Sequence, residues 1–215
     1  MGYSRLLGER MARAAAALDI QTGGGEVLAG IPHPPPVLVA TESWPPNVPV
    51  ARRNLRPLGA AVVAGDEDGL PFRGESFDLV VSRHPVAVVW PEIARVLRPG
   101  GTYLSQQVGA GSNRELTDFM MGPRPVDPAR SARVAVGGAQ AAGLAVAGLR
   151  EQALQVVFYD VAAVVHFLRK VPWAVPGFTV DGYADRLARM HRRIRSRGAF
   201  VSHAQRFLIE ARKPR

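Results

Sequence analysis

The sequence contains no cysteine among its 215 residues, and this absence excludes disulfides, thiolate metal sites and cysteine nucleophiles. Its five histidines show neither HxxxH nor HxH spacing, so we expect no metal site. No apolar run approaches the roughly 18 to 20 residues that a membrane-spanning helix needs, and the N-terminus lacks a secretory-signal pattern. We therefore expect a soluble, cytoplasmic protein without a membrane partner.

Lysine is also scarce, because Lys170 and Lys213 are the only two lysines and arginine supplies most of the formal net charge of +9. Many of these arginines lie in the last 30 residues, between Arg186 and Arg215. A phosphate-rich partner such as RNA would suit this excess. A helix with arginines on its solvated face explains it equally well, so charge alone does not select a partner.

The length suits one buried core and is short for two ordinary domains joined by a linker. In the first two-thirds of the chain, short β-like segments alternate with helix-like segments. This alternation predicts an α/β fold, in which helices cover both faces of a parallel sheet. The expected strands are Ala15–Ile20, Val37–Glu42, Ala61–Ala64, Phe77–Ser82 and Thr102–Gln107.

Capping and breaking residues set the expected helix ends. Pro46 and Asn47 can start a helix that Gly59 ends, and Asp160 can cap a helix that runs to Lys170. The proline-rich residues 121–131 predict an irregular connection. Further helices are expected at 91–97, 115–121, 131–143 and 181–197, and strand-like segments at 146–151, 155–158 and 205–211.

The most informative segment is LDIQTGGGE, residues 18–26, which lies where the first strand ends and a helix is expected to begin. Glycine permits positive φ and a close approach of the backbone to a ligand. Ligands of parallel α/β sheets bind at the carboxyl ends of the strands, so this position favours a nucleotide or nucleoside. The run is not a phosphate-binding P-loop, and a purely structural turn remains an alternative.

Acidic and glycine-rich segments follow at the ends of the next strands. Glu42 ends the second strand, where its carboxylate can accept two hydrogen bonds from vicinal ribose hydroxyls. Asp66 ends the third strand in AGDEDGLPF, and FDLVVSRH forms the fourth strand at residues 77–84. EIARVLRPGG then leads into the fifth strand at residues 92–101.

Residues 18–108 resemble the class I, Rossmann-like methyltransferases that use S-adenosylmethionine, especially the methyltransferase type 11-like group with LPF, SFD and RVLRPGG segments. The resemblance implies a three-layer α/β/α sandwich around a seven-stranded, mostly parallel sheet with an antiparallel final strand. It also implies a single methyltransferase domain over residues 1–215, with a cofactor-binding half at 14–109. The substrate-side half would cover 110–215 and contain an insertion at about 160–200.

The same resemblance implies roles for the strand-end residues. Asp19 and the Gly23–Gly25 turn would line the methionine end of S-adenosylmethionine, and Glu42 would hold its ribose hydroxyls. Asp66 would lie beside the adenine amino group. Ser82 and Arg83 would pass near the cofactor sulfur, and the remaining residues assigned to the cofactor are Gln21, Thr22 and Glu67.

Two features depart from the family pattern. Gln21 replaces the first motif glycine; it can point aside, bond the methionine carboxylate, or weaken binding and leave a poor or inactive enzyme. Few residues precede the first strand, where family members often carry a segment that covers the cofactor. Arg114–Arg130 and Asp160–Arg197 are expected to supply this cover, unless the natural start lies upstream.

The methyl group of S-adenosylmethionine is already activated by its sulfonium, so catalysis mainly requires alignment of the acceptor and exclusion of water. If the acceptor must lose a proton, His84 at the end of the fourth strand is the candidate base. A structural histidine before Pro85 is the alternative. An aromatic acceptor pocket, or ordinary core packing, would use Tyr159, His166, Trp173, Phe178 and Tyr183.

A small-molecule acceptor is favoured because SRHP at residues 82–85 replaces the NPPY-type motif of many base-amino methylases. An RNA methyltransferase is the runner-up, supported by the basic C-terminal half. A catalytically weak or inactive relative is the third hypothesis, because of Gln21. The LPF and RPGG segments disfavour a Rossmann dehydrogenase.

Overall fold

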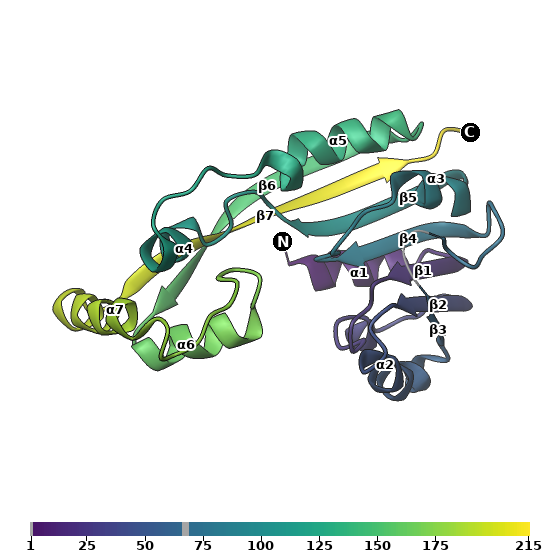
Figure 1. The fold of residues 1–215 in the computed structure, drawn as a ribbon. Coiled ribbons are helices and arrows are strands. Elements are labelled where there is room, and N and C mark those ends of the chain that lie inside the picture. Colours follow the sequence, from purple (N-terminus) through teal and green to yellow (C-terminus); the bar gives the residue numbers. More distant parts are fainter. Residues whose placement is uncertain (1, 66–68) are drawn as a thin grey trace. The chain divides into compact units, whose positions relative to one another are not determined.

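The structure is a computed structural model that describes residues 2–65 and 69–215, and its seven strands form one sheet (Figure 1). The strands are β1 (Ala16–Ile20), β2 (Val37–Glu42), β3 (Ala61–Ala64), β4 (Phe77–Arg83), β5 (Leu97–Val108), β6 (Ala145–Phe158) and β7 (Phe200–Arg212). Their order in the sheet is β3-β2-β1-β4-β5-β7-β6.

Strands β3, β2, β1, β4 and β5 are parallel neighbours. Strand β7 runs antiparallel to β5, because the Gly100 amide donates to the Lys213 carbonyl at 2.9 Å while the Gly109 amide donates to the Gln205 carbonyl at 2.9 Å. The predicted seven-stranded, mostly parallel sheet with a reversed final strand is therefore confirmed.

The described residues form α1 (Tyr3–Met11), α2 (Asn47–Leu55), α3 (Trp90–Val96), α4 (Arg114–Met121), α5 (Ala132–Ala141), α6 (Val161–Lys170) and α7 (Ala184–Arg197). The chain divides into two compact units. The first unit comprises residues 1–107, 132–150 and 207–215, and the second comprises 108–131 and 151–206. Within the described residues, no helix is long and apolar enough to cross a membrane.

In the first unit, hydrophobic cores lie on both faces of the sheet. Leu18 and Ile20 of β1 pack in the core that also contains Ile93 of α3 and Ala135 of α5. The intervening Ala17 belongs to the opposite core. Because successive strand residues point to opposite faces, this alternation gives β1 two buried sides, as the parallel strands of an α/β sheet require.

The opposite core of the first unit is covered by α1 and α2. Leu7 and Met11 of α1 pack with Leu55 of α2 against the sheet residues Leu79 and Val81. The chain before β1 was expected to run directly into that strand, so α1 was missed. The absence of an acidic or side-chain cap at its N-terminus removes the signal that usually marks a helix start.

Helix α5 confirms the expected helix after the proline-rich connection despite its two internal glycines. A Cβ atom on Gly138 would overlap the indole ring of Trp90. Trp90 in turn makes an edge-on contact with Tyr103, with ring centroids 5.4 Å apart. Gly138 therefore lets an aromatic pair pack closely against α5, and this packing offsets the free-energy cost of a glycine inside a helix.

The second unit has its own core, built from α4, α6, α7 and adjoining parts of β6 and β7. Its buried residues include Leu116, Met190 and Phe200. The Asp160 carboxylate accepts a hydrogen bond from the Ala163 amide at 2.7 Å, which confirms the predicted cap of α6.

Two other expectations were wrong. No α-helix follows the glycine turn after β1, where only a 3-10 helix forms at Leu28–Gly30. His33 is followed by three prolines at 34–36, which lack the N–H groups that a helix interior needs. The two expected segments at 146–151 and 155–158 are a single strand, β6, which lies at the edge of the sheet beside β7.

Candidate functional site

The carboxyl ends of β1, β2 and β4 lie next to one another in the first unit. Strands β2 and β3 extend the sheet on one side of β1, and β4 and β5 extend it on the other. This reversal of strand order makes a topological switch point, where α/β sheets bind ligands. Asp19, Glu42 and Ser82 are buried polar residues at these three strand ends.

The glycine turn after β1 depends on left-handed backbone conformations. Gln21, Gly23 and Gly25 have φ values of 59°, 65° and 79°. A Cβ atom on Gly25 would lie 2.9 Å from Cγ of Leu55, whereas one on Gly23 would meet no atom within 4 Å. Gly25 is thus required by packing, while Gly23 leaves open space beside the backbone.

Asp19 ends β1 as a buried carboxyl group, with 8% of its surface exposed. Burial raises its pKa to about 7, and the charge of Glu42 acts in the same direction. The Thr22 hydroxyl donates to Oδ2 of Asp19 at 2.7 Å and partly opposes that rise. This carboxyl group therefore changes its protonation state near neutral pH.

Glu42 holds the glycine turn against the end of β2. Its Oε2 accepts a hydrogen bond from the Gly23 amide at 2.7 Å, and its Oε1 accepts one from the Trp44 amide at 2.8 Å. A carboxylate has about four acceptor positions, so each oxygen retains capacity for a further donor. The backbone of Thr22 also bonds to the Thr41 carbonyl at 2.9 Å, which completes the link between turn and strand.

Ser82 belongs to a buried hydroxyl network between β4 and β5. Its Oγ lies 2.7 Å from the Tyr103 hydroxyl and 2.9 Å from Oγ of Ser105. The Tyr3 hydroxyl of α1 donates to the Ser82 carbonyl at 3.1 Å. Burial raises the pKa of Tyr103, so this network stays uncharged and fixes the end of β4.

The chain leaves β4 through Arg83 and His84. Arg83 is exposed, and its Nε donates to Oε1 of Gln106 at 3.3 Å. The His84 amide donates to the Gln106 carbonyl at 2.7 Å. His84 has a φ of 52°, so both neighbouring strands, β1 and β4, are followed by a non-glycine residue in the left-handed region.

The predicted adenine-side residues Asp66 and Glu67 lie outside the described residues. The preceding Gly65 amide donates to the Glu42 carbonyl at 3.2 Å. The structure therefore brings together Asp19, Gln21, Thr22, Gly23, Gly25, Glu42, Ser82, Arg83 and His84 around the ends of β1, β2 and β4.

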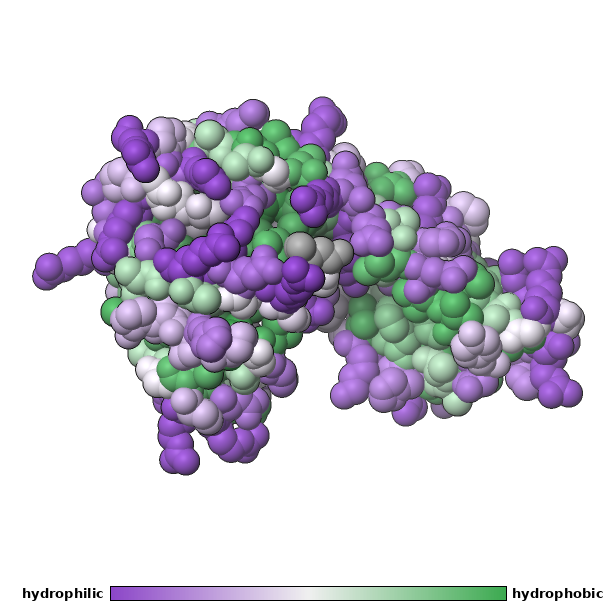
Figure 2. Space-filling model, turned by 180° about the vertical axis from the view of Figure 1, so that it is seen from behind, coloured by the Kyte–Doolittle hydropathy of each residue, from purple (hydrophilic) through white to green (hydrophobic). Residues whose placement is uncertain are grey.

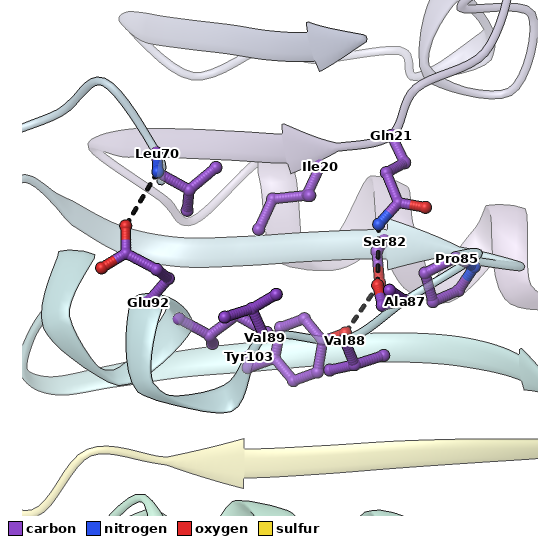
Figure 3. Close-up of a pocket in the computed structure, with 11 residues that line it drawn as sticks. Ile20, Gln21, Leu70, Ser82, Pro85, Ala87, Val88, Val89, Glu92 and Tyr103 are labelled. Atoms are coloured by element: carbon purple, nitrogen blue, oxygen red, sulfur yellow. Dashed lines mark hydrogen bonds between the residues drawn. The ribbon is translucent and has the colours of Figure 1, made fainter. Parts of the chain in front are cut away.

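Sequence reasoning missed the contact that Gln21 makes with the segment after β4. The Gln21 Nε2 donates to the Ala87 carbonyl at 2.7 Å, and its Oε1 accepts from the Val86 amide at 2.6 Å. Figure 3 shows the Gln21 side chain directed from the end of β1 toward Ala87. The replacement of a motif glycine was the sequence signal, but the partner residues lay far along the chain.

A small cavity lies beneath this contact, with a volume of about 10 Å³. Gln21, Ser82, Pro85, Ala87 and Tyr103 are among its lining residues (Figure 3). This volume holds about one water molecule. The Glu42 oxygens and the open space at Gly23 suit the hydroxyls of a nucleoside, whereas the region beside Gln21 is nearly filled.

The second unit contains a larger pocket of about 340 Å³. Polar residues contribute much of its lining, including Arg114, Glu115, Asp118 and Gln205. The five aromatic and histidine residues expected to build an acceptor pocket lie elsewhere in this unit. Tyr159 and Trp173 are 73% and 68% exposed, and the rings of Phe178 and Tyr183 contact each other 5.5 Å apart.

The seven-stranded sheet with its reversed final strand is the Rossmann-like methyltransferase fold, as the sequence resemblance implied. Residues 18–105 match the family described as "Methyltransferase domain". That segment holds most of β1, all of β2, β3 and β4, most of β5 and the described switch-point residues. No curated protein has a sequence significantly similar to that of this chain.

Solved structures share the fold over nearly the whole chain. A proposed methyltransferase from Bacillus halodurans and the YcgJ protein of Bacillus subtilis both have a TM-score of 0.70, at 18% and 17% identity. The alignments cover 99% of this chain and 99% and 98% of those chains. Geranyl diphosphate methyltransferase in complex with GPP and sinefungin has a TM-score of 0.60 at 14% identity, and the alignment covers 98% of this chain and 77% of that chain.

Proposed function

We propose that this protein is an S-adenosylmethionine-dependent methyltransferase with a small-molecule acceptor. The main support for this proposal is the hydrogen bond that the buried Glu42 carboxylate accepts from the amide of the glycine turn at the switch point. A strand-end carboxylate beside a close backbone turn is the arrangement that holds a nucleoside. The single domain over residues 1–215, with a cofactor-binding half at 14–109 and a substrate-side half at 110–215, is part of this proposal.

The proposed roles follow the strand ends. Glu42 has acceptor capacity for the ribose hydroxyls, while Asp19, Thr22 and the Gly23–Gly25 turn border the methionine end. Ser82 and Arg83, at the end of β4, lie nearest the reacting sulfur in this assignment. Asp66 and Glu67 would complete the adenine side.

The bound cofactor would supply a methyl group on a positively charged sulfur, which needs no further activation. The protein's part is then to position the acceptor and exclude water. His84 is the proposed base for an acceptor that loses a proton, because it follows Arg83 directly and its backbone is tied to β5. His84 has a left-handed backbone conformation where the chain turns away from the sheet, and the residue is half-buried.

A small-molecule acceptor is supported by the absence of an NPPY-type motif after β4, where the chain reads SRHP. The geranyl diphosphate methyltransferase with the same fold acts on a small molecule, which adds support without identifying the acceptor of this protein. A substrate screen can identify that acceptor once binding of the cofactor has been established.

Calorimetric titration with S-adenosylhomocysteine and S-adenosylmethionine tests the proposal, with NAD as a control ligand. We expect micromolar binding of the sulfur nucleosides, about −8 kcal/mol, and none of NAD. Binding of NAD alone would contradict the cofactor assignment. Failure of all three ligands to bind would support the hypothesis that this protein is an inactive relative of the methyltransferases.

RNA is the second candidate acceptor because of α7. This helix carries Arg186, Arg189, Arg193 and Arg197 at spacings of three or four residues, which places them along one side. Arg193 lies over the rings of Phe119 and Phe200, 5.9 and 5.3 Å from their centroids. In Figure 2 hydrophilic side chains project from the end of the second unit where α7 lies.

Fluorescence anisotropy with a labelled single-stranded RNA distinguishes this candidate. Binding through α7 should weaken with salt, and the Arg189→Ala/Arg197→Ala variant should lower the slope of log K against log salt by about 0.7 per lost phosphate contact. The matched control is Arg52→Ala/Arg53→Ala on α2, where both arginines are also exposed. Equal effects of the two double variants would remove α7 from the proposal.

A further inference from the structure

Gln21 occupies a backbone position that favours glycine. Its φ of 59° lies in the left-handed region, which L-residues with a Cβ atom adopt at an energetic cost. The same position carries glycine in the family that this chain resembles. Gln21 adopts this backbone conformation although it carries a long side chain. That side chain therefore takes up space in the switch-point crevice.

The side chain is placed by two hydrogen bonds to one short segment. The Gln21 carboxamide donates to the Ala87 carbonyl at 2.7 Å and accepts from the Val86 amide at 2.6 Å. The carboxamide uses both its donor and its acceptor on two neighbouring residues, and these two bonds fix its orientation. We call Gln21, Val86 and Ala87 the clasp.

The clasp joins the two strands that flank the switch point. Gln21 directly follows β1, and Val86 lies three residues beyond the end of β4. The cavity beneath it has a volume of about 10 Å³ and is lined by Gln21, Ser82, Pro85 and Ala87, among others. The amino-acid end of a sulfur nucleoside is much larger than the single water that fits such a space.

We propose that Gln21 is a specificity-determining residue that competes with the methionine end of the cofactor for the switch-point crevice, a proposal that rests on the proposed function. A sulfur nucleoside binds there only when the carboxamide leaves Val86 and Ala87. Ligands that stop at the ribose, such as adenosine, do not require this displacement. The clasp therefore lowers affinity for the amino-acid-bearing nucleosides and leaves the nucleoside portion unaffected.

The clasp is able to open because its hydrogen bonds lie near solvent. Val86 is 80% exposed, and Ala87 is also exposed. An exposed hydrogen bond exchanges readily with water, so its net contribution to stability is small compared with a buried bond. A ligand that offers a carboxylate or an ammonium group can thus replace the carboxamide without leaving buried backbone groups unpaired.

Gln21→Ala and Gln21→Gly test the inference. Both substitutions remove the carboxamide, and the glycine variant also relieves the left-handed conformation. Calorimetry with S-adenosylhomocysteine should show about tenfold tighter binding in both variants, which corresponds to about 1.4 kcal/mol. Adenosine should bind the wild-type protein and both variants equally. The control is Gln140→Ala on the exposed side of α5, which should leave both affinities unchanged.

Amide hydrogen exchange supplies a readout that does not need the cofactor. The Val86 amide should exchange faster in Gln21→Ala than in the wild-type protein, because it loses its acceptor. Addition of S-adenosylhomocysteine to the wild-type protein should also change the protection of this amide. Identical exchange in wild type and Gln21→Ala would show that the clasp does not form in solution, and the inference would fall.

The outcomes separate the clasp from the proposed function. Equal affinity of wild type and both variants for S-adenosylhomocysteine overturns the clasp while the methyltransferase proposal stands. Tighter binding in Gln21→Gly alone assigns the effect to the backbone and also overturns it. If neither the wild type nor any variant binds a sulfur nucleoside, the proposed function fails and the competition fails with it.

Discussion

The Gly23 amide donates a hydrogen bond to the Glu42 carboxylate at 2.7 Å, joining the turn after β1 to the end of β2. The other Glu42 oxygen accepts from the Trp44 amide at 2.8 Å. One side chain therefore shapes the glycine turn and also offers acceptor positions at the switch point. Substitution of Glu42 should therefore affect both the stability of the turn and the binding of a ligand.

Glu42→Gln should weaken binding of S-adenosylhomocysteine about tenfold or more, because hydrogen bonds to a charged acceptor are roughly twice as strong as neutral ones. It should also lower stability, because its single carbonyl oxygen can accept from only one of the Gly23 and Trp44 amides. Glu42→Ala should weaken binding further and lower stability by about 1–3 kcal/mol, because the Gly23 and Trp44 amides lose their acceptor. Calorimetry and urea unfolding provide the two measurements. Unchanged affinity in both variants would remove Glu42 from the ribose role.

Asp19→Asn should alter how stability depends on pH. Burial raises the pKa of Asp19 from 3.8 to about 7, so the folded state holds this proton more tightly than the unfolded state. The Asp19 contribution is thus complete below about pH 4 and is lost as pH rises through about 7, by about 1.4 kcal/mol per pKa unit. The polar groups that interact with it are Thr22, Glu42, Tyr3 and Tyr103.

Urea unfolding between pH 5 and 8 measures this effect. The wild-type protein should lose stability across that window, and Asp19→Asn, which cannot ionise, should lose less. Thr22→Ser retains a hydroxyl donor for Asp19 and serves as the control, with a pH profile like that of the wild type. Parallel profiles for wild type and Asp19→Asn would show that Asp19 titrates at its ordinary pKa.

Gly25→Ala should destabilise the protein more than Gly59→Ala does. Both glycines have positive φ, 79° and 67°, so each substitution carries a backbone cost of about 1–2 kcal/mol. A Cβ atom on Gly25 would also lie 2.9 Å from Leu55, whereas one on Gly59 meets nothing within 4 Å. Thermal and urea unfolding should reveal about 1–3 kcal/mol of additional loss from this overpacking. Equal losses would show that Leu55 moves aside freely.

The parts predicted best from the sequence are the short parallel strands of the first unit. Strand β2 and strand β3 begin and end where expected, because each is a short apolar run bounded by glycine, proline or acidic residues. The ends of β1 and β4 differ by one residue. The location of the candidate site could therefore also be predicted, because the carboxyl ends of parallel strands lie at one edge of the sheet.

The parts predicted least well depend on contacts between distant residues. The segment EQALQ within β6 favours helix by composition, yet pairing within the sheet keeps it extended. The contact of Gln21 with Val86 and Ala87 spans about 65 residues, and no local pattern encodes it. Sequence identified Gln21 as a departure from the glycine motif; only the fold supplied its partners.

His84→Asn tests the proposed base without disturbing its backbone. His84 has a φ of 52°, and asparagine tolerates the left-handed region better than most residues. With an acceptor found by screening, turnover should fall by about 10²–10⁴. The affinity for S-adenosylhomocysteine should stay unchanged, because His84 is assigned to the acceptor's proton and not to the cofactor.

The comparison with His84→Ala separates chemistry from structure. Alanine also removes the imidazole but suits the positive φ less well, so it should add a loss of stability to the same loss of turnover. If His84→Asn retains full turnover and only His84→Ala is impaired, the histidine serves the turn before Pro85. Loss of turnover in both variants, with cofactor affinity preserved, would support His84 as the group that accepts the proton.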